Sequence, residues 1–302
     1  MGQLSANALF HFTPKLEWLA SILEHGFKPR YCEEFNAELD DVPNFMENAS
    51  IPMTCFCDIP LSSIAKHAQY YGKDINGGYG IGLKKNERLM GKLSPILYFN
   101  KSTQIINMLE GIQDRLLNVW AGIGDLSVDQ HKLDGKDFYT RIEDISEKHL
   151  KIMDLSSTSS QAIELVFNLR AYMKPYQNKV GHYRYYDEKE WRYIPDFNVP
   201  PFTGKAFAHR DHPFMLKMKD EFFKDTLKIK DELNESINQH PSLWLTITAE
   251  DIKYLIVKNE QEIHQLLDLV REIDQRTGKF PIESRDLIAS KIVTCEQIFE
   301  DY

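Results

Sequence analysis

Residues 8–26 join a short strand to a helix, and this unit restricts the fold to classes that contain both elements. Residues 8–12 alternate between two faces, as in an extended strand. Thr13 is typical of a helix N-cap and Pro14 of the first helical position. Apolar side chains then follow helical spacing up to Gly26, which is typical of a helix end.

Further strand patterns lie toward both ends of the chain, and the middle is mostly helical. Strands are expected at 52–57, 79–85, 95–100, 242–248 and 252–257, and within 181–197. Helices are expected at 104–123, 159–174, 259–273 and 282–290, and within 58–72. The acidic residues 30–51 are expected to form a loop, in which one short helix is left open. These elements predict an α+β fold, with residues 1–302 as a single domain and residues 101–178 as a mostly helical insertion.

The distribution of charge limits the possible partners. The formal net charge is −9, whereas a protein that binds duplex DNA through phosphate neutralisation normally has a basic balance. Residues 151–220 are the exception, with 11 basic and 8 acidic side chains. Six of the 14 tyrosines lie at 172–193, interleaved with Lys and Arg. This segment, 170–193, suits RNA or a nucleotide.

Several classes of protein lack support in the sequence. The N-terminus has no signal-peptide pattern, no apolar run is long enough to span a membrane, and the four cysteines form no disulfide framework. We therefore expect a cytoplasmic protein. The chain has no P-loop, and the CxC of Cys55 and Cys57 lacks a second pair at zinc spacing, so no metal is expected.

The first candidate site residues are His11 and Thr13, at the junction of the strand and the helix. His11 lies on the strand face opposite to Phe10 and Phe12. A helix N-terminus presents free N–H groups to an anionic ligand, and His11 could bond to a ligand that enters there. A histidine in this position is also typical of a core or capping residue.

A second candidate region is residues 52–83, which contains Tyr71, Tyr79 and a group of glycines. A tyrosine can stack on a heteroaromatic ring, and glycine lets the backbone approach a ligand closely. Tyr71 also lies on the apolar face of the expected helix, as a core residue would.

The third candidate is the segment EKEWR, where an extended strand places Glu190 and Arg192 on one face. Such a pair is often a surface ion pair of ~0–1 kcal/mol. Here it lies in the basic, tyrosine-rich part of the chain, which favours a phosphate-bearing ligand.

Four motifs together resemble the AbiGi family of bacterial abortive-infection proteins. They are FHFT with LEWLASILEHGF, PMTCFCDIPLSSIAKHAQYYG, YGIGLKK and YYDEKEWRYIP, in this order, within residues 8–100 and 180–257. The resemblance implies a phage-resistance protein, described as the antitoxin side of a two-gene system, with a partner protein from the same operon.

The same order of parts is similar to the ADP-ribosyltransferase fold, although CFCDIPLSS matches no transferase signature. This resemblance implies NAD as a substrate and no metal. It implies that His11 holds a ribose or the carboxamide, Tyr71 or Tyr79 stacks on nicotinamide, and Glu190 stabilises the ribosyl cation. Arg192 or Arg30 would meet the pyrophosphate, and Thr13 is a further residue expected to bind the cofactor.

Two hypotheses follow. In the first, the chain is a phage-defence protein with an NAD-binding cleft that transfers ADP-ribose to a macromolecule. In the second, it is a non-catalytic antitoxin that binds a partner protein or RNA. The first predicts that His11 and Glu190 meet in one cleft although 179 positions separate them.

Overall fold

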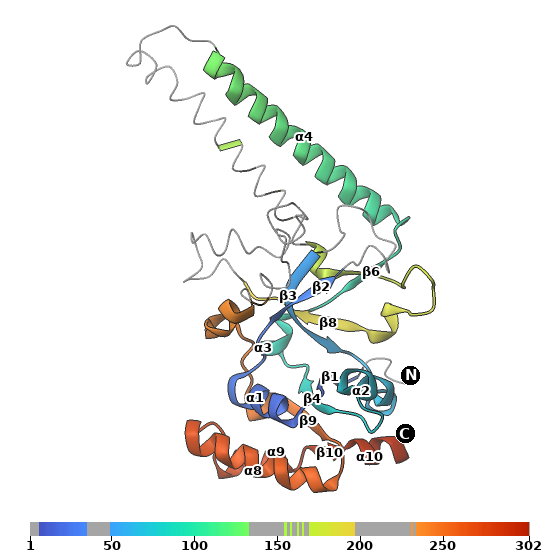
Figure 1. The fold of residues 1–302 in the computed structure, drawn as a ribbon, viewed down its shortest axis with the longest axis vertical. Helices are drawn as coiled ribbons and strands as arrows, with labels where there is room; N and C mark the ends of the chain where they lie inside the picture. Colours follow the sequence, from blue (N-terminus) through green and yellow to red (C-terminus); the bar gives the residue numbers. More distant parts are fainter. Residues whose placement is uncertain are drawn as a thin grey trace.

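The computed structural model describes residues 6–34, 49–132, 170–196 and 234–301, with isolated positions at 154, 155, 158, 162, 165, 169 and 231. Its architecture is α+β, as predicted (Figure 1). The part of the expected insertion that falls within 133–169 lies almost wholly outside the described residues.

A mixed sheet forms the centre of the molecule, with strand order β10-β9-β4-β1-β3-β8-β5 and β2 paired to β3. All neighbouring strands are antiparallel except β9 and β10, which are parallel. The strands are β1 (Ala8–Thr13), β2 (Arg30–Glu34), β3 (Ala49–Cys57), β4 (Tyr79–Lys84), β5 (Leu93–Pro95), β8 (Glu190–Tyr193), β9 (Ile252–Val257) and β10 (Ile292–Thr294).

Helices cover both faces of this sheet. On one face α1 (Leu16–His25) packs on α8 (Glu260–Thr277), with α9 (Ile282–Ala289) beside it, and encloses the larger core around Leu9, Ile81 and Leu255. On the other face α2 (Ala65–Gly72) packs against α10 (Cys295–Asp301) and β1. A short helix, α3 (Glu87–Met90), leads into β5.

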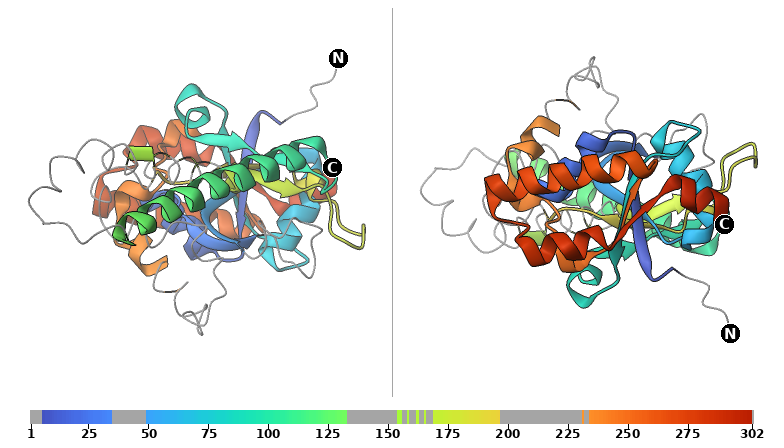
Figure 2. Two further views of the ribbon diagram at one scale, coloured as in Figure 1. Left: turned by 90° about the horizontal axis from the view of Figure 1, so that it is seen from above. Right: turned by 90° about the horizontal axis from the view of Figure 1, so that it is seen from below.

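A second, two-stranded sheet shares a small apolar core with β3. Two parallel strands, β6 (Leu97–Phe99) and β7 (Met173–Pro175), pair with each other, and the 29-residue helix α4 (Gln104–Lys132) starts after β6. Figure 1 shows α4 extending away from the sheet, and Figure 2 shows it on the side opposite to α8 and α9.

Two local predictions about the chain's first strand and helix differ in outcome. The helix ends at His25 with Gly26 as its C-cap, and the φ of 93° at Gly26 explains the glycine. The prediction that Thr13 caps the helix is wrong, because Lys15 is the N-cap and Thr13 is the last residue of β1. The strand therefore continues one residue further than expected and the turn begins at Pro14.

Two other regions were predicted incorrectly. Residues 30–34 form β2 rather than a loop, because this acidic stretch pairs along its whole length with β3. Residues 242–248 form no strand, and Leu245 makes only an isolated antiparallel bridge to Phe27, which lies between α1 and β2. Strand patterns do not distinguish an apolar segment that packs on a sheet from one that joins its ladder.

The glycines of β4 make room for aromatic side chains. A Cβ on Gly80 would lie 2.8 Å from the ring of Phe12, and one on Gly82 equally close to Phe10. We expected these glycines to admit a ligand, and the structure fills the space with the rings of β1.

Candidate functional site

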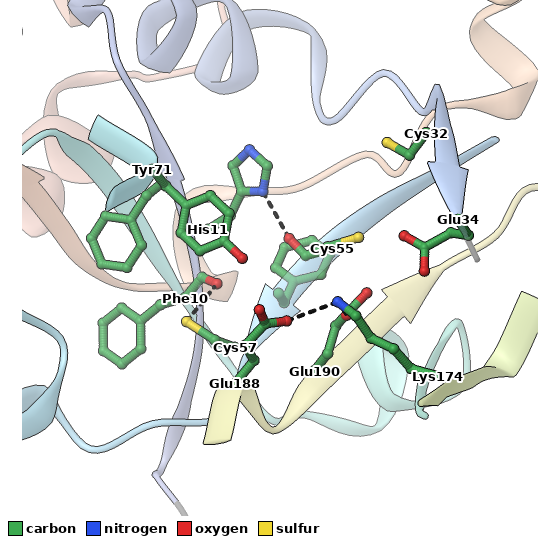
Figure 3. A pocket seen from close by; sticks show the side chains of 12 residues that line it. Phe10, His11, Cys32, Glu34, Cys55, Cys57, Tyr71, Lys174, Glu188 and Glu190 are labelled. Atoms are coloured by element: carbon green, nitrogen blue, oxygen red, sulfur yellow. Dashed lines mark hydrogen bonds and ion pairs between the residues drawn. The ribbon is translucent and has the colours of Figure 1, made fainter. Parts of the chain in front are cut away.

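A cavity of about 220 Å³ opens between β1 and β3 (Figure 3). Its walls come from both sheet faces, from α2 and from the segment before β8. The lining residues are Phe10, His11, Phe12, Cys32, Glu34, Cys55, Phe56, Cys57, Tyr71, Lys174, Glu188 and Glu190.

The cavity exists because β1 and β3 separate after a single paired position, Phe10 with Cys57. Beyond this position the side chain of His11 takes the place of backbone hydrogen bonds between β1 and β3. Its Nδ1 lies 2.8 Å from the carbonyl oxygen of Cys55. His11 also contacts Phe27 edge-on, with the ring centroids 5.2 Å apart. His11 therefore has a structural role at the mouth of the opening.

The hydrogen bond of His11 determines its tautomer. Burial lowers the pKa of the imidazole below its usual value, although the bond to Cys55 opposes this effect. The ring is thus neutral at pH 7, and a carbonyl oxygen can only accept, so Nδ1 has the proton. Nε2 is left as an acceptor, which suits a hydroxyl or amide donor on a ligand.

Glu190 lies in the wall of the cavity and is only 5% exposed. Its Oε1 accepts from Nε of Arg192 at 2.6 Å and its Oε2 from Nζ of Lys174 at 2.8 Å. Burial alone would raise the pKa of this carboxyl, but Arg192 and Lys174 outweigh burial and lower it to about 2. Glu190 is therefore ionised at any physiological pH and fully paired.

Lys174 connects Glu190 to a second carboxylate, Glu188. Its Nζ also donates to Glu188 at 2.9 Å, and the other oxygen of Glu188 accepts from the hydroxyl of Tyr183 at 2.6 Å. Burial would lower the pKa of Lys174, but the surrounding carboxylates hold it well above its usual value. We call Glu34, Lys174, Glu188, Glu190 and Arg192 the buried charge network.

Arg192 is fully buried and closes the network at the other end. Besides Glu190, its guanidinium donates to the carbonyl of Ala171 at 2.8 Å and to Glu34 at 2.9 Å. These bonds direct Arg192 inward, although the resemblance to transferases implied a pyrophosphate contact. The alternation of EKEWR correctly predicted that Glu190 and Arg192 share a face.

The two candidate tyrosines lie in different places. Tyr71 is 40% exposed and lines the cavity, and Figure 3 shows its hydroxyl turned toward the interior. Burial, followed by the charge of Glu188, raises its pKa above the usual range, so the hydroxyl stays protonated. Tyr79 belongs to the larger core and donates to Glu262 at 2.7 Å, away from the cavity.

Thr13 and Arg30 are also outside the cavity lining. Thr13 is buried, and its hydroxyl has no hydrogen-bond partner among the described residues. Arg30 is exposed on β2, opposite Met53. Of the residues proposed from the sequence, the cavity thus brings together His11, Tyr71 and Glu190.

Two cysteines of the cavity, Cys55 and Cys57, are protonated thiols. Burial raises the pKa of Cys57 to about 12 and that of Cys55 well above its usual value. Within the described residues, no group of three or more His, Cys, Asp or Glu side chains is placed to hold a metal ion.

Sequence reasoning missed Glu34, Lys174 and Glu188 as part of this site. Glu188 stands two positions before Glu190, and this repeat of carboxylates was a usable signal. Lys174 comes from β7, which pairs with β6, and Glu34 comes from β2, which pairs with β3. These pairings depend on contacts between segments that are separated in the sequence.

The chain belongs to the AbiGi family. Residues 25–258 match the family model described as "Putative abortive phage resistance protein AbiGi, antitoxin". The chain is also 24% identical over 286 residues to the abortive phage resistance protein AbiGi of Lactococcus lactis subsp. cremoris, covering 92% of this chain and all of that protein. No solved structure matches the chain.

The described helices include none with the length and apolar character that a membrane span requires.

Proposed function

We propose that this chain is the antitoxin component of an abortive phage resistance system and that it acts by binding a partner protein. The description of its family as an antitoxin supports this function. The AbiGi protein that covers most of the chain has phage resistance in its name.

The state of Glu190 is the observation that favours binding over catalysis. A carboxylate stabilises a developing cation when its charge faces the reacting atom and is not already neutralised by a neighbouring cation. Both oxygens of Glu190 already bond to cations, at 2.6 and 2.8 Å, within a buried network. Its charge therefore stabilises the fold, and little of it remains for a substrate.

Helix α4 offers a surface for the partner. Ile105, Met108 and Ile112 are 42, 56 and 46% exposed, at spacings of three and four residues that place them on one face. An exposed apolar stripe on a projecting helix is typical of protein–protein contacts (Figure 1). We infer that this face binds an apolar groove or helix of the partner.

Co-expression with the partner gene of the same operon tests this function. We expect the parent chain to restore bacterial growth and the double variant Met108→Glu/Ile112→Glu to lose this ability while remaining folded. Asn107→Glu adds a charge on another exposed face of α4 and should still restore growth. Full protection by the double variant would contradict the assignment of α4, and no protection by the parent would contradict the antitoxin function.

A second function is favoured by the meeting of His11, Tyr71, Glu188 and Glu190 in one cavity. An ADP-ribosyltransferase-like core would cleave the nicotinamide–ribose bond of NAD, and nicotinamide would leave with the bonding electrons. An acceptor nucleophile would then bond to the ribose carbon and lose its proton. Tyr71 would stack on nicotinamide, and Glu190 would stabilise the ribosyl cation.

Release of nicotinamide from NAD by the purified chain separates the two functions. The binding function predicts no release. The transferase function predicts release by the parent that Glu190→Gln abolishes, while Asp187→Asn, an exposed neighbour outside the cavity lining, retains it.

A further inference from the structure

A second cavity, of about 370 Å³, adjoins the first and has no role in the function proposed above. We call it the α2 groove, because α2 forms one wall and residues 182–188 form the other. Tyr71 and Glu188 line both cavities. Its volume is within the ~300–1,000 Å³ typical of small-molecule sites.

The walls of the α2 groove present flat aromatic surfaces. Tyr70 is 68% exposed and packs edge-on against Tyr71, with the ring centroids 5.0 Å apart. Tyr183, on the opposite wall, is 40% exposed and is fixed by its hydrogen bond to Glu188. Aromatic rings held on both walls are suited to stacking on a planar base.

Two cations stand at the groove. The side chain of Lys66 is exposed and forms no ion pair or hydrogen bond with any described residue. Arg184 bonds to Asp187 at 3.1 Å, but both side chains are more than half exposed, so a phosphate can compete for the guanidinium. This arrangement favours a ligand with a phosphate at one end.

His67 lines the α2 groove from α2. Its Nδ1 is shielded from solvent and has no hydrogen-bond partner among the described residues. Burial lowers the pKa of His67, although the charges of Glu188 and Asp187 oppose this effect. A neutral imidazole can bond to a ribose hydroxyl or to a base edge.

We propose that the α2 groove binds a nucleoside 5′-phosphate. The base stacks on Tyr70 and Tyr183, the phosphate contacts Lys66 and Arg184, and His67 bonds to the sugar or base. The ligand is either a free nucleotide or the 5′-phosphorylated end of an RNA strand, since both present the same chemistry. This site is independent of partner binding through α4.

Calorimetric titration of the purified full chain with the four nucleoside 5′-monophosphates, and with a 5′-phosphorylated RNA tetramer, tests the proposal. We expect Tyr70→Ala and Lys66→Ala each to weaken binding about tenfold. Trp18→Ala and Lys92→Ala remove an exposed aromatic ring and an exposed cation outside the groove, and should leave binding unchanged.

The outcomes distinguish a free nucleotide from an RNA end, and they also show whether the proposal fails. Binding of the monophosphates supports a free nucleotide, and binding of the tetramer alone supports an RNA end. No binding of either probe, binding unaffected by Tyr70→Ala and Lys66→Ala, or equal binding of nucleosides without phosphate would overturn it. Growth rescue through α4 is a separate measurement, so failure here leaves the proposed function intact.

Discussion

The buried charge network and the α2 groove use the same kinds of side chain in opposite ways. In the network, Arg192 is fully buried and bonds to Glu190, Glu34 and a backbone carbonyl. In the groove, Arg184 is 58% exposed and has one carboxylate partner, itself 55% exposed. Both arginines lie in the segment that the sequence identified as basic and rich in tyrosine.

The difference shows that burial, more than residue type, decides what these charges do. A buried cation must keep its partners, because an unpaired charge in a low-dielectric interior is costly. An exposed pair gains little from its own attraction and can exchange its partner for a ligand. We therefore expect substitutions in the network to affect the free energy of unfolding, and substitutions in the groove to affect binding.

The largest effect is expected for Arg192→Met. It removes the cation that pairs with Glu34 and one of the two that pair with Glu190, so we expect a loss of about 3–5 kcal/mol in the free energy of unfolding. Urea unfolding measures this loss. Arg184→Met is the matched control, with an expected change below about 1 kcal/mol. Similar losses in the two variants would contradict the contrast between the regions.

Acid is expected to weaken the network through Glu190. Its pKa in the folded chain is about 2, below the ordinary value of 4.5. Its contribution is therefore complete above about pH 4.5 and is lost as the pH falls toward 2, with a size on the order of 3 kcal/mol. Unfolding measured from pH 7 to 3 should show a steeper acid limb in the parent than in Glu190→Gln, and parallel curves would refute this prediction.

A smaller effect is expected where the two regions meet. Tyr183→Phe removes the hydroxyl that donates to Glu188 and leaves the ring in the groove. We expect a loss of about 1–1.5 kcal/mol in stability with little change in nucleotide binding. Thermal unfolding and titration on the same sample measure both. A large loss of binding would mean that the hydroxyl, rather than the ring, contacts the ligand.

The smallest effect on stability is expected for Lys66→Ala. Its side chain is exposed and forms no ion pair or hydrogen bond with a described residue, so we expect a change within about 0.5 kcal/mol. Urea unfolding beside Lys92→Ala checks this. A clear destabilisation specific to Lys66→Ala would assign the residue to the fold instead of to a ligand.

Elements whose apolar pattern is local were predicted from the sequence. The strands β1, β4 and β9 and the helices α1 and α8 lie close to their expected positions, because each has its own periodicity and end signals. Strand β2 was missed, because its charged side chains resemble a loop and its stability depends on pairing with β3.

The candidate site was predictable only in part, for a similar reason. The strand period correctly placed Glu190 beside Arg192, but it contains no information about depth, so a surface pair and a buried network look alike. Lys174, the second cation on Glu190, comes from β7, inside the stretch expected to be helical. The sequence could not show which of Tyr71 and Tyr79 lines the cavity, because this depends on the packing of β4 on α8.

The most direct test of whether the chain acts by binding is growth rescue by two variants. One is Glu190→Gln and the other is the α4 double variant Met108→Glu/Ile112→Glu. Both variants are co-expressed with the partner gene at a temperature at which circular dichroism shows them folded. We predict that Glu190→Gln still restores growth and that the α4 variant does not. Loss of rescue in folded Glu190→Gln, with full rescue by the α4 variant, would contradict the account.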